Sequence, residues 1–236
     1  MKKLNGDPIG AAINDYARTK KPQDIIVSSD ICDDDIIPIE VLFRKLDEMP
    51  TIEQMALDKC TGNVLDVGAG AGAHAIELMD RGIQVSAIDI SAGAVDWMTK
   101  QGISARKVNF FDLKNETYDT ILMLMNGIGI AGTLANLERT LRHAASLLNS
   151  GGKILCDSSD IKYLYEDEDG SLWVDLNSEY YGNFRFQMKY KNEKGDWFDW
   201  LYVDFDNLFK VAESVGLKAR RIHEEDDHYL AELTKI

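Results

Sequence analysis

Cysteine is scarce in this sequence, and the few cysteines are not arranged for disulfides or for a metal. The 236 residues include three cysteines, Cys32, Cys60 and Cys156, which are odd in number and form no CxxC pair. Disulfide-stapled domains and zinc sites need cysteines at characteristic spacings. We therefore expect reduced cysteines that pack as small hydrophobic residues, no metal centre, and a cytoplasmic location.

Positive charge is scarce as well. The chain has 26 Lys and Arg residues against 40 Asp and Glu residues, which gives a formal net charge of −14. Proteins that bind nucleic acids or anionic membranes present a basic surface to phosphate groups, whereas this chain repels phosphate at long range. The composition therefore argues against a nucleic-acid or membrane partner.

Long apolar runs are also missing. Residues 1–8 contain two lysines but lack the apolar segment of a signal peptide, so we do not expect secretion. The uncharged stretch at 120–137 contains asparagines and glycines, which favour a strand, a loop and a helix start over a membrane span. With 45% apolar residues the chain can bury a sizeable core, and its length predicts one domain with additions.

Short apolar runs alternate with amphipathic stretches through the middle of the chain. Residues 51–54 match a capping box, which predicts a helix before the first strand. After it, strands are expected at 63–67, 83–89, 103–110, 118–125 and 153–157, with helices at 73–81, 91–100 and 134–148. Five strands that alternate with helices indicate an α/β fold with a doubly wound parallel sheet.

The two ends of the chain depart from this alternation. A helix expected at 205–215 precedes two strand-like runs at 217–223 and 229–233. Such a hairpin at the end of a parallel sheet indicates one antiparallel strand. The first fifty residues are less regular, and we expect them to form a helical lid or covering segment.

Aromatic residues are concentrated in one segment, 160–205, which holds more than half of them. An apolar and polar alternation over 184–190 and an extended run at 197–203 predict an antiparallel β-hairpin with one apolar face. Such a face can cap a substrate or form a dimer surface. The expected organisation is a lid segment, a nucleotide-binding core, the hairpin insertion, and a last helix with the terminal hairpin: 1–50, 51–159, 160–204 and 205–236.

A glycine-rich loop follows the first expected strand of the core. Gly68, Gly70 and Gly72 allow a sharp turn and let a nucleotide-like ligand approach the main chain in front of the next helix. Asp89 ends the second strand, where a carboxylate can accept hydrogen bonds from both hydroxyls of a ribose. The pattern Gly68-x-Gly70-x-x-Ala73 also fits a dinucleotide fingerprint, so the glycines alone leave the nucleotide open.

Asp66, just before the glycines, separates the alternatives. A carboxylate there would repel a pyrophosphate but could pair with a cationic amino-acid ligand. With this residue and the terminal hairpin, the chain resembles the class I S-adenosylmethionine-dependent methyltransferases: residues 64–72 look like their first motif and 85–91 like their second. The resemblance covers about 51–157 and 205–236. It implies a Rossmann-like seven-stranded sheet of order 3-2-1-4-5-7-6 whose seventh strand is antiparallel.

The resemblance also implies which residues contact S-adenosylmethionine. They are Arg44 at its carboxylate, Asp66 at its ammonium group, Gly68, Ala69, Gly70 and Gly72 along its methionine and ribose parts, Asp89 at the ribose hydroxyls, Ile90 against the adenine, Asn109 with Phe110 at the adenine amino group, and Met125 beside the sulfonium. The position at the adenine amino group is shared between Asn109 and Asp112, and we favour Asn109.

Two residues are candidates for catalysis. Asp157, at the end of the fifth strand, is the best-placed carboxylate for a general base, and Asn126 could orient the acceptor by hydrogen bonding. Transfer to an amine or a thiol needs little acid–base help because the methyl donor is already activated. We interpret His74 as a packed helix residue and His223 and His228 as parts of a solvated turn.

The resemblance implies an enzyme that methylates a small molecule enclosed by the N-terminal segment and the aromatic hairpin. The chain has no Asn-Pro-Pro-Tyr-like motif after the fourth strand and no Pro-Cys loop, which argues against methylation of DNA bases or of protein glutamine. Two alternatives stay open: an NAD(P)-dependent oxidoreductase, and a non-catalytic S-adenosylmethionine-binding subunit whose hairpin binds a partner protein. A homodimer is compatible with the aromatic face.

Overall fold

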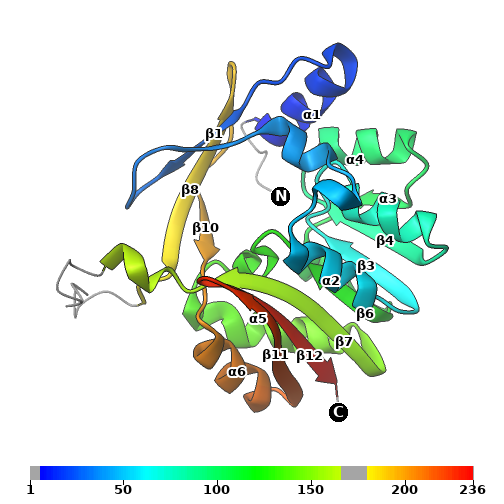
Figure 1. Cartoon of the computed structure of the whole chain (residues 1–236), viewed down its shortest axis with the longest axis vertical. Helices are drawn as coiled ribbons and strands as arrows, with labels where there is room; N and C mark the ends of the chain where they lie inside the picture. Colours follow the sequence, from blue (N-terminus) through cyan, green and yellow to red (C-terminus); the bar gives the residue numbers. More distant parts are fainter. Residues whose placement is uncertain (1–5, 166–179, 236) are drawn as a thin grey trace.

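A computed structural model of the chain describes residues 6–165 and 180–235, and its centre is a seven-stranded sheet (Figure 1). The strand order is β11-β12-β7-β6-β3-β4-β5. β12 is antiparallel to both of its neighbours, and the remaining pairs are parallel. Counted along the chain from β3, this confirms the expected order 3-2-1-4-5-7-6. The strands are β3 (Asn63–Val67), β4 (Gln84–Asp89), β5 (Ala105–Lys107), β6 (Tyr118–Met123), β7 (Leu148–Ser159), β11 (Leu217–Glu225) and β12 (His228–Lys235).

Helices cover both faces of the core sheet. α2, α3 and α4 pack into a buried cluster on one face, and α5 and α6 pack into a second cluster on the other. β6 supplies Leu122 to the first cluster and Ile121 and Met123 to the second. Its run is almost wholly apolar because a central parallel strand is buried on both sides. The helices are α2 (Thr51–Lys59), α3 (Ala73–Asp80), α4 (Ala92–Lys100), α5 (Leu134–Ser146) and α6 (Phe205–Ser214).

The start of α2 differs in detail from the sequence prediction. The helix begins at Thr51 as expected, but Pro50 occupies the N-cap and no side chain caps the helix. The capping box predicted at 51–54 is therefore wrong. The side chain of Gln54, the expected partner of Thr51 in the box, instead donates to the carbonyl oxygen of Met49 at 2.7 Å.

The N-terminal segment is only partly helical. It forms α1 (Pro8–Thr19) and the short 3₁₀ turns η1 (Ile39–Phe43) and η2 (Leu46–Glu48), but also two strands that the sequence analysis missed, β1 (Ile25–Ser29) and β2 (Asp35–Ile37). These strands join the aromatic hairpin in a second sheet of order β10-β8-β1-β2, with β9 paired to β8. The hairpin strands are β8 (Asn183–Tyr190), β9 (Glu193–Lys194) and β10 (Phe198–Leu201). The two expected additions to the core thus form one unit, which we call the cap: α1, β1, β2, β8, β9 and β10.

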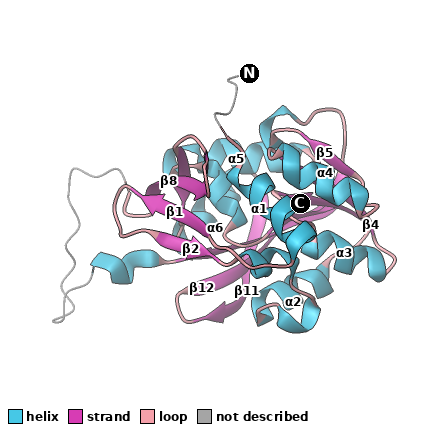
Figure 2. Cartoon of the chain, turned by 90° about the horizontal axis from the view of Figure 1, so that it is seen from above, coloured by secondary structure: helices cyan, strands magenta, loops and turns pink. Residues whose placement is uncertain are grey.

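The cap is attached to the core at two places (Figures 1 and 2). α1 crosses α4 so closely that a Cβ on Gly10 would lie 2.7 Å from the Cα of Gly93. Asp7 fixes this crossing, since its carboxylate accepts the N–H groups of Gly10 and Gly93, both at 2.9 Å. Seen from above, α1 lies between α4 on one side and β1 and β8 on the other.

The second attachment joins β10 to the turn η4 (Gly127–Ala131), which follows β6. Trp200 lies directly on Gly129, where a Cβ would come within 2.3 Å of the indole nitrogen. The second sheet therefore stands over the edge of the core where the parallel strands end (Figure 1). In α/β sheets this is the edge at which ligands bind.

Parts of the aromatic insertion expected at 160–204 lie outside the described residues, at 166–179. Within 6–165 and 180–235, no helix has the length and apolar character that a bilayer crossing requires. The same residues contain no group of three or more side chains suited to holding a metal ion.

Candidate functional site

The glycine loop after β3 leaves space above two of its glycines. Gly68 and Gly70 have positive φ values of +71° and +57°. A Cβ on Gly68 would meet no atom within 4 Å, and one on Gly70 would meet only Leu42, at 3.9 Å. Gly72 is different, because a Cβ there would lie 2.5 Å from the side chain of Ile103. Two glycines thus keep the loop open to a ligand, and the third allows close packing beneath it.

Asp89, at the end of β4, is held beside this loop. Its two oxygens accept the N–H groups of Gly70 at 2.9 Å and Ser91 at 2.8 Å. Burial raises the pKa of Asp89, and the N–H groups that it binds oppose this effect. Next to it, the side chain of Ile90 is 54% exposed and therefore available to a flat apolar ligand.

Of the two residues expected at the adenine amino group, Asn109 lies at the surface and Phe110 lies in the core. Asn109 is exposed, and its side-chain oxygen caps the next turn by accepting the N–H of Phe111 at 2.9 Å. Phe110 is only 2% exposed and packs edge-on against His143 in the core. This burial favours a packing role for the Phe110 side chain over direct contact with a ligand.

Asp66 is a buried carboxylate with an unused oxygen. The residue is 2% exposed, and among the described residues nothing hydrogen-bonds to its Oδ2. Burial raises the pKa of Asp66 to about 6, although the positive charge of His74 opposes the shift. A buried acceptor without a partner costs folding free energy, so a polar group that binds Oδ2 would be strongly favoured.

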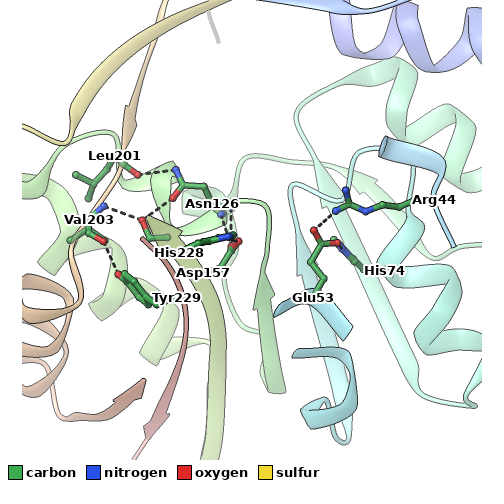
Figure 3. Close-up of polar contacts among 11 residues, drawn as sticks. Arg44, Glu53, His74, Asn126, Asp157, Leu201, Val203, His228 and Tyr229 are labelled. Carbon is green, nitrogen blue, oxygen red and sulfur yellow. Dashed lines mark hydrogen bonds and ion pairs between the residues drawn. The ribbon is translucent and has the colours of Figure 1, made fainter. Parts of the chain in front are cut away.

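Arg44, Glu53 and His74 form a series of linked polar side chains (Figure 3), and the charge of His74 acts on Asp66. Arg44 pairs with one oxygen of Glu53, and His74 Nε2 lies 2.7 Å from the other. Burial by itself would raise the pKa of Glu53, but His74 and Arg44 lower it. Burial by itself would lower the pKa of His74, but the bond to Glu53 and the charge of Asp66 raise it. Along the series Arg44, Glu53, His74 and Asp66, groups that can carry a positive charge therefore alternate with groups that can carry a negative one.

His74 has a polar partner that the sequence analysis did not predict. His74 is buried as expected, yet its imidazole is ion-paired rather than simply packed. Arg44 retains a buried Nε for which the described part of the chain offers no partner. The site thus presents one unused anionic oxygen and one unused cationic donor.

A second polar group lies where β6 and β7 end (Figure 3). Met125 and Asn126 have left-handed backbones, with φ values of +62° and +58°, which is uncommon for residues other than glycine. Asp157 stabilises this turn, since its Oδ1 accepts the N–H groups of Asn126 at 2.9 Å and Gly127 at 3.4 Å. Its Oδ2 lies 2.8 Å from Nε2 of His228, which the sequence analysis had placed in a solvated turn.

The side chain of Asn126 links the core to the cap. Its Nδ2 donates to the carbonyl oxygen of Leu201 at 3.2 Å, and its Oδ1 accepts the hydroxyl of Ser158 at 2.8 Å. The Ser158 hydroxyl oxygen in turn accepts the N–H of Val203 at 3.0 Å. Asn126 therefore fixes the strand β10 over the end of β6, while the neighbouring Met125 side chain is 40% exposed.

One face of the second sheet is apolar and only half-buried. The register places Phe186 opposite Phe198 and Phe184 opposite Trp200, so all four aromatic rings share a face. Phe186, Phe198 and Trp200 are partly exposed on it. The opposite face contains Arg185, Lys189 and Asp199, which are exposed.

Comparison with known proteins agrees with this architecture. Residues 39–200 match the family model of a methyltransferase domain. A crystal structure of an S-adenosylmethionine-dependent methyltransferase from Bacteroides fragilis, in complex with S-adenosyl-L-homocysteine, is 47% identical; the match covers 99% of this chain and 97% of that one, with a TM-score of 0.92. No curated protein matches the chain.

The fold and the glycine loop define a class I S-adenosylmethionine-dependent methyltransferase. The chain belongs to the methyltransferase-domain family, and S-adenosylmethionine is its cofactor. The oxidoreductase alternative is not favoured, because the same glycine loop lies in a sheet with the antiparallel seventh strand of this class.

More distant structures share the fold alone. A sugar N-methyltransferase from Streptoalloteichus is 13% identical, with a TM-score of 0.55 over 78% of this chain and 85% of that chain. An amino pentose methyltransferase from Micromonospora echinaspora, bound to S-adenosylmethionine, is 12% identical, with a TM-score of 0.54 over 79% of this chain and 92% of that chain.

Proposed function

We propose that the enzyme methylates a small-molecule acceptor bound between the cap and the ends of β6 and β7. The observation that carries the proposal is the half-buried aromatic face of the second sheet, which includes Phe186 and Phe198. Attachments at Gly93 and Gly129 fix this face over the end of the core sheet. The net charge of −14 disfavours a nucleic-acid acceptor, and two solved structures with this fold are named as enzymes of sugars.

The unused polar atoms fit the amino-acid end of S-adenosylmethionine. Asp66 Oδ2 is a buried acceptor suited to an ammonium group, and Arg44 Nε is a buried donor suited to a carboxylate. Gly68, Ala69 and Gly70 would line the adjoining part of the cofactor with backbone, while Gly72 packs beneath the loop. The ammonium and carboxylate groups of the bound amino acid would each lie next to a side chain of opposite charge, at Asp66 and Arg44 respectively.

The nucleoside end would lie against β4. Asp89 keeps lone pairs free beyond the two N–H groups that it accepts, so it would bind the ribose hydroxyls. Ile90 would pack on the adenine, and Asn109 would lie at its edge. The side chains of Ile90 and Asn109 are both exposed, and the hydrogen bonds of Asp89 hold its carboxylate in place.

When bound, S-adenosylmethionine supplies a methyl group activated by its positively charged sulfur. The chain's contribution is to hold donor and acceptor in line and to exclude water, which accounts for much of the barrier reduction in such transfers. The strained turn at Met125 and Asn126 is suited to this task because Asp157 and the cap fix it on both sides.

Replacement of Asp89 with alanine should weaken binding of S-adenosylhomocysteine by roughly 30- to 300-fold, the loss expected for hydrogen bonds to a charged group. The fold should persist, since burial already disfavours the Asp89 charge. Calorimetry measures the affinity and a thermal melt measures the stability. Asp96→Ala, at an exposed position on α4, is the control and should bind normally. A melting temperature that drops as far as that of Leu122→Ala would show that Asp89 is structural.

Transfer of labelled methyl groups tests the proposed function. Purified enzyme and labelled S-adenosylmethionine are incubated with a panel of alcohols, phenols, amines, thiols and amino sugars, and in parallel with DNA and tRNA. We expect turnover with a small molecule and none with either nucleic acid. Labelling of nucleic acid alone, or no turnover together with a stable protein complex in light scattering, would contradict it. The homodimer and the cytoplasmic location stay predictions from the sequence.

A further inference from the structure

His228 combines an exposed imidazole with a buried carboxylate that orients it. It is the first residue of β12 and pairs with Ser159 at the end of β7, so it lies at the edge where the proposed acceptor binds. The His228 side chain is 38% exposed, and its Nε2 lies 2.8 Å from Oδ2 of Asp157, a side chain that is 1% exposed. Among the described residues, no group hydrogen-bonds to Nδ1 of this ring.

Asp157 itself is poorly suited to receive a proton from a substrate. Its Oδ1 accepts N–H groups of Asn126 and Gly127, and its Oδ2 is paired with His228. Almost none of the side chain contacts solvent. The carboxylate that the sequence indicated as a base is therefore placed to orient a base, by holding one ring nitrogen and leaving the other free.

We propose that His228 is the general base of methyl transfer, acting through Nδ1 on an acceptor whose nucleophilic oxygen or nitrogen still carries a proton. This inference rests on the proposed function. The acceptor's bond to the methyl carbon forms while the carbon–sulfur bond of the donor breaks, and the electron pair of that bond stays on sulfur. The acceptor's proton moves to Nδ1 and is then released to water. Asp157 is a positioning residue, because it contacts the imidazole and not the acceptor.

The charges around His228 are consistent with this role. The hydrogen bond to Asp157 raises the pKa of His228, burial opposes it, and the charges of Asp157, Glu53 and Glu225 raise it further. These groups come from β7, α2 and β11, the elements around the ring. A base acts in its neutral form, so transfer should decline as the pH falls through this raised pKa.

Nitrogen-15 NMR of the S-adenosylhomocysteine complex tests the geometry without an acceptor. The neutral form of His228 should carry its proton on Nε2, toward Asp157, and leave Nδ1 unprotonated. Its pKa should lie above 6.5 and should drop in Asp157→Asn. Comparison with His228→Gln assigns the signal. A neutral tautomer protonated on Nδ1 would overturn the proposal whatever the acceptor is.

Kinetics with the best acceptor of the panel test the chemistry. His228→Gln should lower kcat by about 10²- to 10⁴-fold, the range typical of a lost general base, while affinity for S-adenosylhomocysteine stays within twofold. The matched control is His223→Gln on the neighbouring strand β11, whose Nε2 has no partner in the described part of the chain. It should keep wild-type kcat. A His228→Gln kcat within threefold of wild type refutes the base, whereas a wild type that methylates no small molecule of the panel refutes the proposed function instead.

Discussion

Gly70→Val should abolish detectable binding of S-adenosylmethionine and of S-adenosylhomocysteine. Gly70 has a φ of +57°, and the space beyond its missing Cβ is open as far as Leu42. A branched side chain would occupy this space, where the ligand must approach the backbone. It would also displace the N–H that Asp89 accepts at 2.9 Å. We expect a loss of more than 100-fold in affinity, measured by calorimetry.

A second glycine-to-valine variant serves as the control, because it strains the backbone in the same way at a position outside the glycine loop. Gly216 has a comparable φ of +80° and also has open space beyond its Cα, but it follows α6, which packs on the opposite face of the core sheet from α3, the helix after the glycine loop. Gly216→Val should therefore show a similar fall in melting temperature with normal binding. If both variants bind S-adenosylhomocysteine equally well, the glycine loop does not contact the cofactor.

Asp66→Asn should lose cofactor affinity and gain stability. The pKa of this carboxyl is raised from 3.8 to about 6 in the folded protein. The folded state therefore binds more protons than the unfolded state between these values, and stability from this group falls as the pH rises from about 4 to 6. Above pH 6 the buried charge destabilises the fold, on the order of 1 to 3 kcal/mol. Asparagine removes that charge, so the melting temperature at pH 7.5 should rise.

The same substitution should remove a pH dependence of binding. An ionised Asp66 attracts the cofactor's ammonium group, so the wild-type Kd should increase as the pH falls below about 6, by up to tenfold per unit. Asp66→Asn should bind S-adenosylhomocysteine about 30- to 100-fold more weakly at pH 7.5, with a nearly flat profile from pH 5 to 8. Calorimetry over this range provides the test. A variant that binds as tightly as wild type, or that is less stable than wild type, would contradict the assignment.

The core of the fold could be predicted because its signals are local. The strands at 63–67 and 118–125 show in the sequence as apolar runs beside glycines and amphipathic helices, and the parallel order follows from their alternation. The hairpin at 217–233 predicted the antiparallel strand that the structure confirms. These elements depend little on residues far away in the chain.

The strands of the N-terminal segment could not be predicted in this way. β1 and β2 are short, and β1 is stabilised by pairing with β8, with Val27 opposite Met188. Neither strand has an alternation long enough to identify alone. The capping box failed because Pro50 occupies the N-cap and the side chain of Gln54 donates instead to the carbonyl oxygen of Met49.

The candidate site likewise contains some residues that the sequence predicts and others that it does not. The glycine loop, Asp66 and Asp89 lie within one βαβ unit, so their order along the chain already predicts a common site. Asp157 and His228 are far apart in the sequence and meet only because β7 and β12 are antiparallel neighbours. A histidine beside acidic residues in a turn is more often solvated, and no local pattern identifies its partner.

A crystallographic density map of the enzyme with S-adenosylhomocysteine tests the account most directly. It should show the ammonium group at Asp66, the carboxylate at Arg44 and the ribose hydroxyls at Asp89. The ligand's sulfur should face Met125, on the side of His228 and the aromatic face of the second sheet. Density for the ligand elsewhere, or a ribose that does not contact Asp89, would contradict the account.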